Sequence, residues 1–135
     1  TSTFSNTAEI VAQKNMNNWF LISGAILSLL GMVFHGFVGG KIYVANVNKS
    51  NLEPLGKTLS IFSWQFHTIF LFITACTLIH IAINPEFAIA AYPIICISIL
   101  GAIYFLVLGI GNREFLKMPG AVLMGAIALL ALLGI

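Results

Sequence analysis

Three histidines are the side chains in this sequence best suited to chemistry. His35 lies near the end of the first long apolar stretch, and His67 and His80 lie in the second. If the two stretches are antiparallel helices joined at 41–58, His35 and His67 each lie about 7 to 12 Å from the same end, at ~1.5 Å per residue. We therefore expect His35 and His67 to meet. His80 lies about 20 Å further along its helix, close to the opposite end.

Three roles are open to the pair formed by His35 and His67. As axial ligands they would hold one haem b between two helices, and only then would they be metal ligands. With Trp64, Gln65 and Tyr43 nearby, they could instead contact a quinone head group. The third role is structural: the two imidazoles hydrogen-bond each other or Ser/Thr partners and set the helix register. We favour the structural role, and so expect no cofactor.

Composition places most of the chain in lipid. Of its 135 residues 59% are hydrophobic and only 7% are charged, and the mean hydropathy is +1.02. A soluble domain carries about 25% charged residues. Ten charged side chains cannot cover a water-facing surface. We therefore expect an integral membrane protein, contacting lipid and other membrane subunits and no nucleic acid.

The apolar stretches predict an all-α bundle of four transmembrane helices with short loops, forming a single domain over 1–135. The expected spans are about 19–40, 59–83, 87–111 and 119–135, preceded by a short polar tail at 1–16. Asn17 and Asn18 supply an N-cap for the first span, and Trp19 an interfacial anchor. The glycines at 36, 39 and 40 either loosen its end or let it continue to about Val47. Pro93 either kinks the third span or marks its first turn.

Small residues mark one face of the first span for packing against another helix. They recur at steps of three or four, which places them on one side of a helix and lets a neighbour approach closely. With His35, this face consists of Gly24, Ser28, Gly31 and Gly39.

The distribution of basic residues predicts the orientation in the membrane. Five of the six lie in the segments 41–58 and 112–119. The positive-inside tendency places these loops on the cytoplasmic or matrix side, with both termini opposite. The expected location is a bacterial inner membrane or an organellar inner membrane.

Motifs for enzymatic chemistry are absent from the sequence. It contains no aspartate, and its four glutamates lie outside the expected spans. A proton relay through the bundle therefore has no carboxylate to use, and neither a phosphate-binding loop nor a catalytic triad can be assigned. We expect no catalytic residues and, at most, a role in electron transfer.

Two short motifs resemble a pattern in small four-helix bacterial membrane proteins of uncharacterised function. They are His35-Gly-Phe-Val-Gly39 and, after a polar segment, Trp64-Gln-Phe-His67. Those proteins carry His-Ser-x-x-Gly-Glu at the end of the first helix and Trp-His-x-Thr in the second. Here Gly36 replaces the serine, Gly40 replaces the glutamate, and two residues separate Trp64 from His67. The resemblance implies four membrane helices and no activity.

Together these features predict an accessory or structural subunit of a larger membrane complex, respiratory or photosynthetic. The first alternative is a small redox protein that binds haem b or quinone at His35 and His67. The second is a small transporter, which would need a broken helix lined by polar groups.

Overall fold

Helices account for almost all of the computed structural model, which describes residues 2–135, with side chains from Gln13 onward. The long helices are α1 (Ser2–Val33), α3 (Pro54–Ile83) and α4 (Ala91–Gly111), followed by α6 (Gly120–Gly134). A π-helical turn, η1 (Phe34–Gly39), joins α1 to α2 (Gly40–Lys49). A 3-10 segment, η2 (Pro85–Ala90), precedes α4, and the one-turn helix α5 (Arg113–Leu116) follows it. The described part contains no strand.

Three continuous helical segments are long and apolar enough to cross a membrane. They are Gln13–Lys49, Pro54–Ile83 and Pro85–Gly111. The all-helical, membrane-spanning class predicted from the sequence is therefore confirmed to this extent. Helix α6 is equally apolar but has 15 residues, where about 20 are needed to cross the hydrocarbon.

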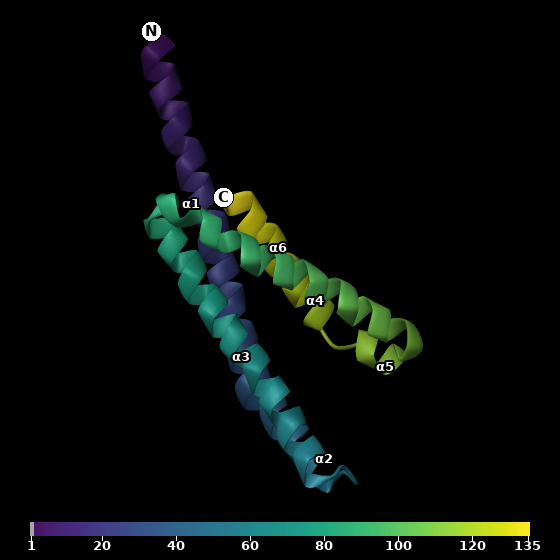
Figure 1. The fold of residues 1–135 in the computed structure, drawn as a ribbon. Coiled ribbons are helices and arrows are strands. Elements are labelled where there is room, and N and C mark those ends of the chain that lie inside the picture. Colours follow the sequence, from purple (N-terminus) through teal and green to yellow (C-terminus); the bar gives the residue numbers. More distant parts are fainter. Residues whose placement is uncertain (1) are drawn as a thin grey trace.

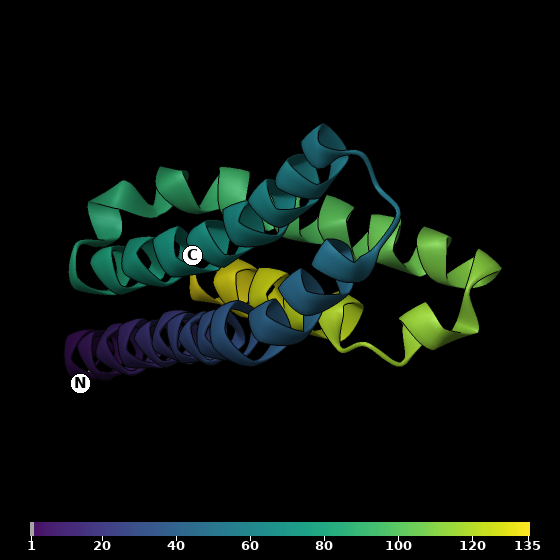
Figure 2. The ribbon, with the colours of Figure 1, turned by 90° about the horizontal axis from the view of Figure 1, so that it is seen from below.

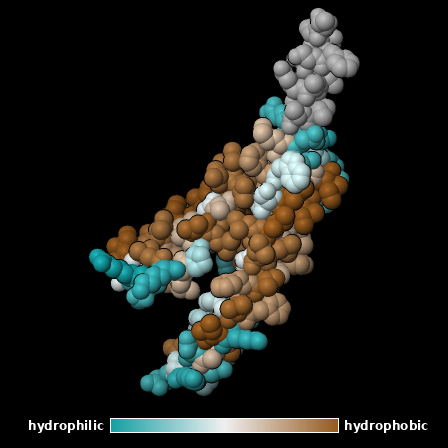
Figure 3. All heavy atoms as spheres, turned by 180° about the vertical axis from the view of Figure 1, so that it is seen from behind, coloured by the Kyte–Doolittle hydropathy of each residue, from teal (hydrophilic) through white to brown (hydrophobic). Residues whose placement is uncertain are grey.

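The four long helices form two antiparallel hairpins that share one end and diverge from it (Figure 1). One hairpin is α1 with α3, and the other is α4 with α6. Helix α6 packs against both α1 and α4 and lies between them (Figure 2). Hydrophilic residues gather at the outer tips of both hairpins, with a broad hydrophobic surface between (Figure 3).

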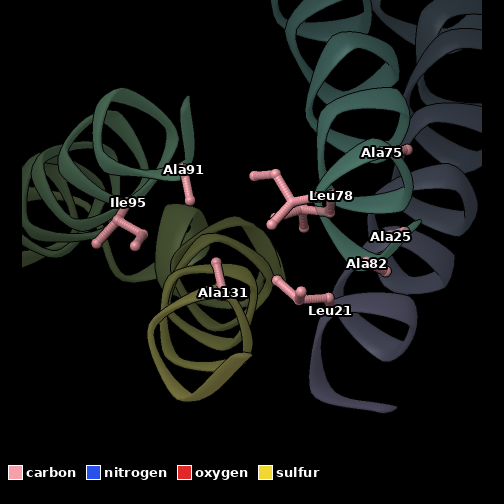
Figure 4. Packing of buried hydrophobic residues seen from close by; sticks show 9 residues of the cluster. Leu21, Ala25, Ala75, Leu78, Ala82, Ala91, Ile95 and Ala131 are labelled. Atoms are coloured by element: carbon pink, nitrogen blue, oxygen red, sulfur yellow. The ribbon is translucent and has the colours of Figure 1, made fainter. Parts of the chain in front are cut away.

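The hydrophobic core lies at the shared end of the two hairpins. Its small side chains let the helices pack close together. Buried Leu21, Leu78 and Ile95 meet alanines from all four long helices (Figure 4). These alanines are Ala25, Ala75, Ala82, Ala91 and Ala131. Alanine lets helix backbones approach closely, so dispersion contacts replace the hydrophobic drive that lipid does not provide.

Of the two expectations for the glycines at 36, 39 and 40, the structure shows that the helix continues past them, and α2 occupies residues 41–49 of the segment 41–58. Gly40 has helical dihedral angles, φ −59° and ψ −43°, so the helix continues through the glycines. Val47 is buried, which ties α2 to its surroundings. Ser50 ends the helix, its backbone N–H and its hydroxyl both donating to the Val47 carbonyl. Pro54 then opens α3 at a position where its missing N–H costs nothing.

The starts of α1 and α4 also bear on the sequence predictions. Helix α1 begins at Ser2, so Asn17 and Asn18 lie within it and do not cap it. Pro93 lies in the first turn of α4, where proline is tolerated, and does not kink the span.

Two glycines provide a matched test of the packing between α1 and α6. A Cβ on Gly31 would lie 2.8 Å from a methyl of Leu123, whereas a Cβ on Gly125 meets nothing within 4 Å. We expect Gly31→Leu to lower the free energy of unfolding by about 1–3 kcal/mol through overpacking. Gly125→Leu should leave that of the isolated chain unchanged or raised. Equal losses in SDS titrations followed by circular dichroism would contradict this arrangement.

Candidate functional site

The π-helical turn η1 positions His35 against helix α3. A π-helical turn holds more residues than an α-helical turn, shifts the backbone carbonyls out of the α-helical register, and recurs at functional sites. Here the His35 carbonyl accepts a hydrogen bond from Trp64 Nε1 at 3.1 Å. Trp64 of α3 therefore donates a hydrogen bond directly to the π-helical backbone of the first span.

Glycines allow α3 to come this close to the turn. A Cβ on Gly36 would lie 2.9 Å from the Thr68 methyl, and one on Gly39 would lie 3.0 Å from the Trp64 ring. Both distances are shorter than ordinary carbon contacts, so a larger residue at either position would require Thr68 or Trp64 to shift. Gly36 and Gly39 are thus required by their neighbours at this crossing.

Aromatic rings from the first span (η1 and α2) and from α3 alternate in a stack. Trp64 lies between Tyr43 and His35, nearly parallel to both, with ring centroids 4.2 Å and 4.0 Å away. His67 meets His35 edge to face, with centroids 4.8 Å apart. Offset stacks and edge contacts of this kind add about 0.5–1.5 kcal/mol each beyond the area they bury. We call Tyr43, Trp64, His35 and His67 the ring stack.

A hydroxyl group links the ring stack to the backbone of α3. His35 Nδ1 lies 3.0 Å from Thr68 Oγ1, which lies 3.5 Å from the Trp64 carbonyl oxygen. The hydroxyl has one proton, so both hydrogen bonds form together only if Nδ1–H donates to Thr68 and Thr68 donates to the carbonyl. This arrangement leaves His35 Nε2 as an acceptor.

The structure brings some of the predicted site residues together and separates others. His35, His67 and Trp64 are partly buried and adjacent, while Gln65 is exposed and outside the ring stack. His80 lies at the other end of α3, beside Phe87, with ring centroids 4.9 Å apart.

Sequence reasoning missed Thr68, although a signal was present. Thr68 follows Trp64 by four residues, so the two share one face of α3. The close approach of Thr68 to Gly36 was also not predicted.

The small-residue face of the first span contacts protein along its length. Gly24 is buried beside Leu78 and Leu130, and Gly31 lies beside Leu123. Ser28 is fully buried, and its hydroxyl donates to the Gly24 carbonyl at 2.8 Å. Bonding back to its own helix satisfies this hydroxyl where no water is present.

The ring stack does not fit a haem held between His35 and His67. An iron bound by both imidazoles would separate the rings and place the porphyrin between them. Here the imidazoles touch edge to face, and Trp64 stacks on His35. His35 Nδ1 is also bonded to Thr68. A quinone would need hydrogen-bonding groups only, and His67 makes no hydrogen bond among the residues with described side chains.

Comparisons with protein-family models, with curated proteins and with solved structures found no match to this chain.

Two threonines on α3 allow a matched test of the hydrogen bond to His35, because only one of them makes it. Thr68→Val removes the partner of His35, and we expect it to lower the free energy of unfolding by about 0.6–1.5 kcal/mol. Thr74 is fully buried and its hydroxyl has no partner within the described part of the chain, so Thr74→Val should be neutral or stabilising. SDS titration of both variants measures the difference. A Thr68→Val variant as stable as Thr74→Val would mean that this hydrogen bond contributes nothing.

Proposed function

We propose that this chain is an accessory, structural subunit of a larger membrane complex. The observation that carries the proposal is the outer face of α6, which is shaped to receive another helix. Gly125 lies on that face between Val122 and Leu129, one turn to either side and 75% and 56% exposed. No atom of the residues with described side chains lies within 4 Å of a Cβ placed on Gly125, apart from its own helix backbone and chain neighbours. The two larger side chains therefore flank a notch.

A glycine inside a helix needs a packing reason. It costs up to about 1 kcal/mol relative to alanine, and no contact among the described residues requires it at this position. Membrane helices use such positions to bring a partner's backbone close. An apolar helix of another subunit, with a side chain seated over Gly125, supplies that reason.

The use of the polar groups in the first two spans supports the same proposal. His35, Thr68 and Trp64 bond to one another and to backbone across the contact between η1 and α3. Ser28 bonds within its own helix. These groups stabilise the hairpin, and a transporter would instead need polar groups facing a pathway or a broken span.

For the membrane topology we propose four spans, with α6 crossing as the fourth. The antiparallel pairing of α6 with α4 supports this, since Met124 and Phe105 contact Gly101 and Gly120 respectively. Local thinning of the bilayer or inclusion in a complex accommodates its short length. The tips of both hairpins carry the basic residues of the segments 41–58 and 112–119, so we place both tips on the cytoplasmic or matrix side. The membrane is a bacterial or organellar inner membrane.

Quinone contact at the ring stack is the second candidate function. It is favoured by His67, which is partly buried beside His35 and makes no hydrogen bond among the residues with described side chains. A quinone carbonyl would accept a hydrogen bond from a ring N–H of His67. The exposed Gln65 has no part in this version of the site.

Filling the notch on α6 tests the structural role. We expect Gly125→Leu to release the chain from a larger complex in mild detergent extracts of its own membrane, because leucine occupies the space of the partner's side chain. Native gel electrophoresis measures the shift. Gly111→Leu is the matched control, since a Cβ on Gly111 also meets nothing within 4 Å but lies at the end of α4.

Three outcomes separate the candidates. Loss of the large species in Gly125→Leu alone supports a structural subunit. A chain that migrates at its own mass without any substitution contradicts it. Bound quinone in the purified chain that is lost in His67→Leu, with no large species present, supports the second candidate.

A further inference from the structure

A cavity at the shared end of the hairpins has the lining of a ligand site. It is a pocket of about 470 Å³, open on one side, where α1, the turn from α3 into η2, and the end of α6 meet. This volume falls within the range of small-molecule sites, about 300–1,000 Å³. Its lining comprises Gln13, Lys14, Asn17, Asn18, Leu21, Ile81, Pro85, Ala88, Gly134 and Ile135.

The cavity has one polar wall and one apolar wall. Helix α1 supplies the polar wall, an ammonium group from Lys14 and carboxamides from Gln13, Asn17 and Asn18. The apolar wall comes from Leu21 and the residues of α3, η2 and α6. A site of mixed character that ends in a cation suits a molecule with a charged head and an apolar body.

The cavity lies where the polar part of α1 meets its apolar part, as expected at the boundary between lipid head groups and hydrocarbon. Lys14, Asn17, Asn18 and Leu21 follow one another at steps of three, one and three on one face of α1. That face is polar up to Asn18 and is buried from Leu21 to Ser28, where Ser28 is its one polar residue. Trp19 lies at the same level and is 69% exposed, as expected for an aromatic residue at the head-group boundary.

We propose that this cavity binds the phosphate head group of a membrane phospholipid. The Lys14 ammonium and the amide N–H groups of Asn17 and Asn18 would donate to the phosphate oxygens, which are strong acceptors. The glycerol and first methylene groups would lie along Ile81 and Ala88. Glu86 follows Pro85 in η2 but is exposed and does not line the cavity. This site is independent of the proposed function, since it lies away from both the ring stack and the Gly125 notch.

Binding of defined lipids to the full chain in detergent micelles tests the proposal. The probes are dioleoylphosphatidylglycerol, dioleoylglycerol with the same acyl chains and no phosphate, and inorganic phosphate. Native mass spectrometry counts bound molecules and gives relative affinities. We expect one phosphatidylglycerol retained per chain, and about tenfold weaker binding in Lys14→Gln, the size expected for one hydrogen bond to a charged group.

Lys41→Gln is the matched control, because it removes the same charge from α2, at the tip of the other end of the hairpin. It should retain the lipid as the unsubstituted chain does, and circular dichroism checks that both variants fold. Three results would overturn the proposal: dioleoylglycerol retained as well as phosphatidylglycerol, equal losses in Lys14→Gln and Lys41→Gln, or no loss in Lys14→Gln. Inorganic phosphate that displaces the lipid at equal concentration would assign the cavity to a free anion instead.

Discussion

The hydrogen bond from Trp64 to the His35 carbonyl is the interaction on which the first hairpin depends. In hydrocarbon, water does not compete for backbone carbonyls, so a hydrogen bond between two helices is made by protein groups alone. The His35 carbonyl lies in the π-helical turn, and the indole N–H of Trp64 donates to it, with 3.1 Å between nitrogen and oxygen. The glycines at 36 and 39 allow this approach, and stacking of Trp64 on His35 and Tyr43 fixes the indole plane. Each feature of the ring stack is thus tied to one backbone irregularity.

The second hairpin, α4 with α6, is held mainly by close packing at small residues, with few polar contacts. Helix α6 lies between α1 and α4, and small residues bring it close to both, through Gly31 on one side and Gly101 on the other. Away from the shared core the hairpins diverge (Figure 1). Much of α4 and the outer face of α6 therefore remain free for lipid or for another subunit. These outer faces carry many exposed large hydrophobic side chains, among them Leu100 and Val122.

The sequence predicted the helical membrane class from its composition. It predicted the meeting of His35 with His67 because both lie at similar distances from the segment that joins two antiparallel helices. It did not predict the π-helical turn, because the glycines there fit α-helical spacing equally well. It left open whether the glycines end the first span, and the structure decides this through helical Gly40 and buried Val47 in α2. Gln65 was placed in the site by its neighbours in sequence, although one residue along a helix turns a side chain by about 100°. The interfacial cavity joins four segments, and no single stretch encodes it.

Infrared spectroscopy of the chain with a heavy-isotope carbonyl label at His35 measures the central hydrogen bond directly. If Trp64 bonds to this carbonyl, Trp64→Phe raises its stretching frequency, while Trp19→Phe, which changes the other tryptophan, leaves it unchanged. The same frequency in all three proteins would show that the indole does not bond to the turn, and that another interaction holds the first two spans together.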